Sequence, residues 1–164
     1  MVLFYPYTMK YRRLTKEQLE ELHQEFINFL ATQSITGAEW QELKEKQPEV
    51  AEQELDVFSD LIWEGVLQKA QYLANTSAKQ LYFFKAEETG IRLILVKIEA
   101  DEDLTSPEGL QWLQENLDTS EVELFTAEKE YVGERNQELF ALIEQGAVIT
   151  DAQWFDALEG FIRT

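Results

Sequence analysis

The chain has 164 residues, of which 45% are hydrophobic and 12% aromatic, enough apolar material to exclude a wholly disordered acidic chain. Asp and Glu number 32 against 14 Lys and Arg, so the net charge is −18, which repels nucleic acid and anionic membranes. There is no Cys, which excludes disulfides, a thiolate nucleophile and a Cys-ligated zinc ion.

The N-terminus is apolar over residues 1–8 and becomes basic only afterwards, at Lys10, Arg12 and Arg13. A secretory signal has the opposite order, and no apolar run is long enough to span a bilayer. We therefore expect a cytoplasmic protein without a membrane-spanning segment. Residues 1–8 are expected to be an N-terminal extension or arm, and 9–164 a single α+β domain.

The N-terminal half carries three helical patterns. Thr15 and Gln18 have the spacing of a capping box, and Thr36 begins a second helix in the same way. A third pattern runs from about residue 48 to 74 and is apolar around most of its surface, which predicts a long, central and deeply buried helix. One apolar stripe consists of Leu55, Phe58, Ile62, Val66, Ala70 and Leu73, and it is widened by Leu61, Trp63, Leu67 and Tyr72.

The pattern then changes from helical to extended. Residues 81–84 and 91–98 read as the strands of a hairpin joined by the loop 87–90, and 122–125 as a third strand. The strand 91–98 is apolar on both faces, which is typical of a central strand. Helices are expected at 107–117, at 134–145 and after Thr150, which is expected to cap the last helix. The expected fold class is α+β, with a helical N-terminal half and long central helix, then a small antiparallel sheet with flanking helices.

Negative charge gathers in the C-terminal part of the chain. Residues 101–164 contain 16 Asp and Glu but 3 Lys and Arg, whereas residues 1–50 contain 8 and 6. Like charges about 5 to 7 Å apart resemble the phosphates of a nucleic-acid strand, while an acidic coat for solubility is the simpler explanation. The acids that suggest a binding face are Glu121, Glu123, Glu130, Glu134 and Glu138.

Trp112 does not share the apolar face of its predicted helix. It lies about 100° or more around the helix from Leu110, Leu113 and Leu117. Either this helix is packed on two sides, or Trp112 is exposed, and an exposed Trp is a common anchor of a protein interface.

Two weaker patterns involve carboxylates. Glu20 and His23 form a Glu-x-x-His pair, half of a di-iron motif, but His23 is the only His in the chain, so we interpret it as a partly buried structural residue. Asp60 and Glu64 are one helical turn apart and could serve as an acid and a base, but we interpret them as part of a solvated polar strip. No phosphate-binding loop or nucleophile elbow is present, and no cofactor is expected.

Three stretches, from Met9 through Trp40, from Asp56 through Leu67 and from Gly146 through Thr150, together resemble an uncharacterised family of short acidic cytosolic proteins of Bacteroidota, a domain of unknown function. The resemblance covers nearly the whole chain after residue 8. It implies a bacterial cytosolic protein and supplies no catalytic residue.

These patterns predict a non-enzymatic interaction or regulatory protein that binds a basic protein partner through its acidic C-terminal half, without direct contact to nucleic acid. An antagonist or nucleic-acid mimic is a special case. The alternative is a small carboxylate-dependent enzyme or metal-binding protein that uses Glu20, His23, Asp60 and Glu64. The expected partner-binding residues are Trp112, Glu121, Glu123, Glu130, Glu134 and Glu138.

Overall fold

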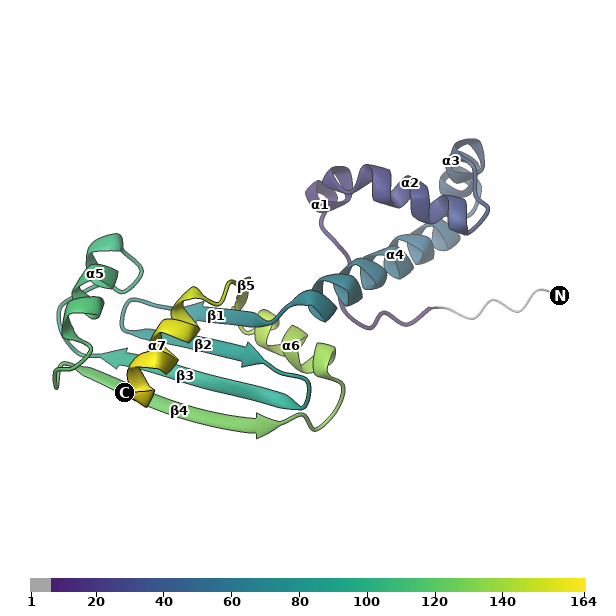
Figure 1. Cartoon of the computed structure of the whole chain (residues 1–164). Coiled ribbons are helices and arrows are strands. Elements are labelled where there is room, and N and C mark those ends of the chain that lie inside the picture. The colour runs from purple at the N-terminus through teal and green to yellow at the C-terminus, as the bar shows by residue number, and fades with distance from the viewer. Residues whose placement is uncertain (1–6) are drawn as a thin grey trace. The chain divides into compact units, whose positions relative to one another are not determined.

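The computed structural model describes residues 7–164 and has the expected α+β class (Figure 1). The chain forms two compact units, the helical unit Met1–Val66 and the sheet unit Leu67–Thr164. The boundary lies within one continuous helix, α4. That both units fold as the single domain expected for residues 9–164 stays a prediction, and the expected N-terminal arm falls largely on residues 1–6, outside the described residues.

The helical unit is organised around aromatic side chains. The Phe58 ring of α4 lies with its centroid 5.1 Å from that of Phe26 and 5.4 Å from that of Phe29, and Trp40 packs edge-on against Phe26. The predicted capping box at Thr15 is confirmed, because Thr15 and Gln18 exchange both hydrogen bonds. The helices are α1 (Lys16–Glu21), α2 (His23–Thr32), α3 (Gly37–Lys46) and α4 (Pro48–Lys69).

The buried carboxylate of Asp60 holds the segment that precedes α1 against α4. Asp60 accepts hydrogen bonds from the Tyr7 hydroxyl (2.7 Å) and from the backbone N–H groups of Lys10 (2.7 Å) and Tyr11 (2.9 Å). Glu64, one turn later, accepts from the Tyr11 hydroxyl and pairs with Lys10. The predicted solvated strip is therefore wrong at Asp60, because the N-terminal segment covers this carboxylate in place of water.

Tyr7 and Tyr11 are expected to ionise at a higher pH than an ordinary tyrosine. Burial and the hydrogen bond to Asp60 raise the pKa of Tyr7 to about 12, and burial and the bond to Glu64 raise the pKa of Tyr11 to about 12. Because these values exceed the ordinary pKa of 10.0, the protonated phenols stabilise the fold fully below pH 10. That stabilisation is lost as the pH rises from about 10 through about 12.

An ultraviolet titration of tyrosinate checks this expectation. Two of the six tyrosines should ionise near pH 12 in the folded protein, and Tyr7→Phe and Tyr11→Phe should each remove one of them. A late phase that both variants retain would show that other tyrosines produce it.

The sheet unit contains one antiparallel sheet of five strands in the order β4-β3-β2-β1-β5. The expected fold class is confirmed, with two strands more than the hairpin and third strand predicted. The elements are β1 (Tyr72–Thr76), β2 (Gln80–Ala86), β3 (Gly90–Ile98), α5 (Pro107–Asn116), β4 (Val122–Glu130), α6 (Arg135–Glu144), β5 (Val148–Thr150) and α7 (Gln153–Arg163).

One face of the sheet carries the main core of this unit. Leu81 and Phe83 of β2 and Ile94 and Val96 of β3 form a buried cluster with residues of α5 and α7. The Phe83 ring stacks on Trp154 at 6.0 Å. Figure 1 shows α7 crossing this face, while α6 lies on the other side of the sheet. Alternate residues of β2 and β3 therefore face two different environments.

Helix α4 ends earlier than its pattern predicts. The apolar spacing continues to residue 74, but the helix ends at Lys69 and 72–76 form β1. The guanidinium of Arg135, in α6, donates hydrogen bonds to the carbonyls of Leu67 and Ala70. It thereby satisfies carbonyl groups that a helix C-terminus leaves unpaired, and no residue near Lys69 signals this end in the sequence.

Two further differences concern strand ends. β4 continues five residues past Phe125, to Glu130. The sequence does not predict this extension, because residues that are exposed on both faces of a strand show no apolar alternation. Thr150 lies in the three-residue strand β5 and does not cap the last helix. The carboxylate of Asp151 instead accepts a hydrogen bond from the backbone N–H of Gln153.

Candidate binding surface

The acids predicted as one binding face lie at two ends of β4. Glu121 and Glu123 are exposed at its start, and Glu130 is exposed at its last residue. A strand rises about 3.4 Å per residue, so Glu123 and Glu130 are roughly 24 Å apart. A partner that touches both ends must therefore extend along the strand.

The two remaining acids belong to the turn between β4 and α6. Glu134 is the N-cap residue of α6. Glu138 pairs with Lys129 at 3.0 Å and accepts a hydrogen bond from the backbone N–H of Val132. Burial raises the pKa of Glu138, but its bonds to Lys129 and to the backbone of Gly133 and Val132 outweigh this and hold the pKa below its usual range. Glu138 thus stabilises the turn.

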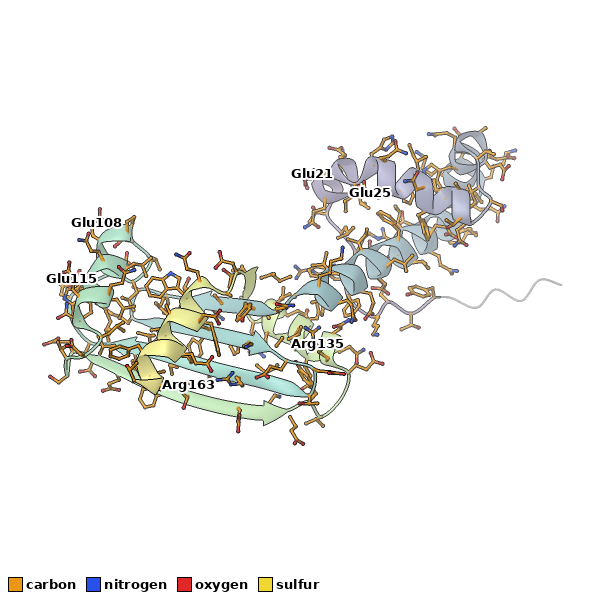
Figure 2. All side chains as sticks on the ribbon, in the orientation of Figure 1. Glu21, Glu25, Glu108, Glu115, Arg135 and Arg163 are labelled. Carbon is orange, nitrogen blue, oxygen red and sulfur yellow. The ribbon has the colours of Figure 1, made fainter. Side chains whose placement is uncertain are left out.

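For Trp112, the structure favours a helix that is packed on two sides over an exposed side chain. It is partly buried and packs against the core cluster of the sheet unit, together with Leu110 and Leu117. Helix α5 is therefore packed on more than one side. The side chains of Glu108 and Glu115 are exposed and lie on the outer side of this helix (Figure 2). Trp112 stabilises the fold, and its role as a partner anchor stays a prediction.

The second face of the sheet is apolar and only partly covered. Tyr82 pairs in register with Leu95, and Leu95 with Phe125, so their side chains share this face. The next row places Phe84 opposite Leu93. We call this surface the open sheet face. It is formed by Tyr82, Phe84, Leu93, Leu95, Phe125 and Ala127.

Exposure increases along this face toward β4. The rings of Tyr82 and Phe84 stack at 6.4 Å, and Leu93 and Leu95 are half-buried. Phe125 is 48% exposed. Monomeric proteins seldom leave contiguous apolar surface in water, and such a patch with a polar rim is typical of an interaction site.

Helix α6 limits the open sheet face on the side of β1. Its Leu142 lines a hollow of about 200 Å³ with Phe84, Leu93 and Ala127, where the lining is mostly apolar. A second hollow of about 310 Å³ lies between Leu142, Phe84 and Tyr82. Both are shallow, so this surface is suited to side chains of a protein partner more than to an enclosed small molecule.

The basic residues of 101–164 are already engaged within the sheet unit. Lys129 pairs with Glu138, and Arg163 pairs with Glu159 at 2.6 Å. Arg135, the third, binds the carbonyls at the end of α4. Outside this segment, Lys97 and Arg92 of β3 stand opposite Glu123 and Glu128 in the strand register, so cations offset part of the negative charge of β4, whereas Glu130 stands opposite Gly90.

A hollow of about 400 Å³ beside α7 holds a closed ion-pair network. Arg92 and Arg163 both donate to Glu159 at 2.6 Å, and Arg92 stacks on the Phe155 ring. The hydrogen bond from Arg92 is the largest cause that lowers the pKa of Glu159. Arg92 also pairs with Glu87 at 3.6 Å, and Glu128 lines the same hollow. Carboxylates therefore offset both guanidinium groups, and no net positive charge remains for an anionic ligand.

The structure does not assemble the alternative carboxylate site. Glu20 lies on α1 and His23 on α2, because the helix is interrupted at Leu22, and both side chains are exposed. The expected partial burial of His23 is therefore wrong. Asp60 and Glu64 accept hydrogen bonds from the N-terminal segment. Across residues 7–164, no group of three or more metal-ligating side chains forms.

Sequence reasoning did not identify the open sheet face. A strand that is apolar on both faces, as 91–98 is, predicts burial on both sides, and the pattern cannot show that α6 reaches only part of one side. The single available signal is Phe125, an aromatic residue directly followed by the polar run Thr126–Glu130.

In the part of the chain that the structure describes, no helix combines the length and the apolar character needed to cross a bilayer.

Comparison with known proteins gives a family without an assigned activity. No curated protein matches the chain, and no solved structure matches it. The model of the family of unknown function DUF6495 matches residues 9–163. Since that match spans nearly the whole sequence, the chain belongs to the DUF6495 family.

Proposed function

We propose that this protein is a non-enzymatic interaction protein that binds a basic protein partner through its sheet unit. The observation that carries the proposal is the open sheet face beside an acidic edge strand. Apolar surface supplies affinity once it is removed from water, and surrounding charges steer the encounter and select the partner.

The charge distribution supports a basic partner. Glu121, Glu123 and Glu130 are exposed, and no ion pair joins them to another of the described residues 7–164. Such charges attract a basic surface over about 8 Å at physiological ionic strength. A partner whose basic surface otherwise contacts nucleic acid is the special case of an antagonist. A cytoplasmic, bacterial setting belongs to the same proposal and stays a prediction.

Charge reversal tests the proposal. A variant with Glu121, Glu123 and Glu130 changed to Lys should capture less of the partner from an extract of the source cells. With the captured protein purified, association should slow about tenfold or more, because peripheral charges act mainly on the association rate. Binding of the unaltered protein should weaken as salt is raised.

A variant with the same change in net charge provides the control. Glu21, Glu25 and Glu45 are exposed residues of the helical unit, two of them labelled in Figure 2. Their change to Lys should leave capture and association nearly unaltered. An acidic partner, binding that is independent of salt, or equal loss in both variants would contradict the proposal and leave the acids as a solubility coat.

A further inference from the structure

β4 is a long strand at the edge of the sheet. It spans nine residues and pairs with β3 on one side only. Among the described residues, no strand pairs with its outer side. The opposite edge is formed by β5, which has three residues. An unpaired edge offers a row of backbone N–H and C=O groups to another extended chain, and β4 offers a much longer row than β5.

The open sheet face continues up to this edge. Phe125 and Ala127 of β4 lie on it, opposite Leu95 and Leu93 of β3. A strand added beside β4 would place every second side chain on this face, next to Phe125 and Ala127. Backbone pairing and burial of the exposed Phe125 ring would therefore occur together.

Charge selects the occupant of this edge. β4 carries Glu123, Glu128 and Glu130, and its one basic residue, Lys129, is ion-paired to Glu138. A second copy of the chain would bring the same excess of negative charge to the contact. Glu128 and Glu130 lie on the other face of β4 from Phe125 and Ala127. A segment with apolar side chains on the open sheet face and Lys or Arg on its other face would place its basic side chains beside these two acids, and opposite charges across strands attract whereas like charges repel.

We propose that the basic partner contributes an extended segment that pairs with the outer edge of β4 as a sixth strand, with apolar side chains on the open sheet face. This inference rests on the proposed function and specifies the form of the partner. It also accounts for the separation of the acids, because a segment paired with β4 passes both Glu123 and Glu130.

A peptide of alternating Lys and Val, as long as β4, serves as the probe with the full chain. A second peptide has the same side chains but N-methyl groups on its interior backbone nitrogens, which removes its N–H donors. The first peptide should bind, and the second should bind at least about tenfold more weakly, because several backbone hydrogen bonds are lost. Amide hydrogen exchange of residues 123–130 should slow only with the first peptide.

Two protein variants locate the contact. Phe125→Ala should weaken binding of the unmethylated peptide about tenfold, because the exposed aromatic contact is lost. Val148→Ala, at a more exposed apolar residue on the β5 edge, should leave the affinity unchanged. Both residues are exposed, so neither change removes a core contact.

The outcomes distinguish this inference from the proposed function. Equal binding of both peptides, no binding of either, or protection confined to other strands would overturn strand pairing, while charge-reversal capture would still decide whether a basic partner is bound. A dimer in sedimentation analysis that Phe125→Ala dissociates would overturn it in favour of a second copy.

Discussion

Replacing Phe58 with alanine is expected to lower the free energy of unfolding by about 3 to 5 kcal/mol. Phe58 is 2% exposed and lies at the centre of the helical unit. Its ring contacts those of Phe26 and Phe29. The truncation therefore removes buried apolar area and leaves a cavity between α2 and α4, which the surrounding helices can close only in part.

Leu61→Ala on the same helix is the matched control. Leu61 shares the apolar sequence pattern of α4, yet it is 56% exposed, so its truncation should change stability by no more than about 0.5 kcal/mol. Denaturant-induced unfolding of both variants measures the difference, and hydrogen exchange of α2 shows whether the loss lies in the helical unit. Equal losses in the two variants would mean that Phe58 is not the core residue of this helix.

The comparison of Phe58 with Leu61 also shows what hydrophobic periodicity conveys. Local signals predict the helix starts, because a cap such as Thr15 with Gln18 lies within one turn and depends on no distant residue. The position of each side chain relative to its neighbours depends on contacts far along the sequence. Thus the helix at 48–69 is predicted, while the exposure of Leu61 is not.

The elements that the sequence does not predict are those defined by distant partners. The end of α4 is set by Arg135, and β5 exists through pairing of Val148–Thr150 with β1. Asp60 reads as a solvated residue on a polar strip, and only the return of the N-terminal segment over α4 makes it a buried acceptor. None of these contacts has a signal within a few residues.

The candidate site was predictable in composition and unpredictable in geometry. Charge counting identifies the acidic region around β4, and Glu121, Glu123 and Glu130 are exposed there. It cannot show that these acids lie at separate ends of an edge strand, or that Glu138 is held by Lys129. The open sheet face depends on how far α6 extends across the sheet, which is a property of the assembled unit.

Gly109→Ala is expected to destabilise the sheet unit although alanine is the better helix former. Gly109 is buried in the first turn of α5, where its N–H donates to the Ser106 hydroxyl. A Cβ atom at this position would lie 1.8 Å from the carbonyl oxygen of Asp103. That backbone is held in place because the next residue, Leu104, is 1% exposed and donates its N–H to Ala78.

Relief of this clash requires α5 or the preceding loop to move away from the core. Such overpacking costs about 1 to 3 kcal/mol or more, which exceeds the gain of about 0.5 to 1 kcal/mol that alanine brings to a helix. Gly160→Ala in α7 is the control, since Gly160 is exposed and its added Cβ would meet nothing within 4 Å apart from its chain neighbours and the backbone of its own helix. It should raise stability by the helix gain alone.

Thermal and denaturant unfolding of the two variants should therefore give changes of opposite sign for the same chemical substitution in the same unit. Hydrogen exchange should increase in α5 for Gly109→Ala and stay unchanged there for Gly160→Ala. If both variants are stabilised, the loop before α5 yields without cost, and the close approach of Gly109 to Asp103 does not hold this helix against the sheet.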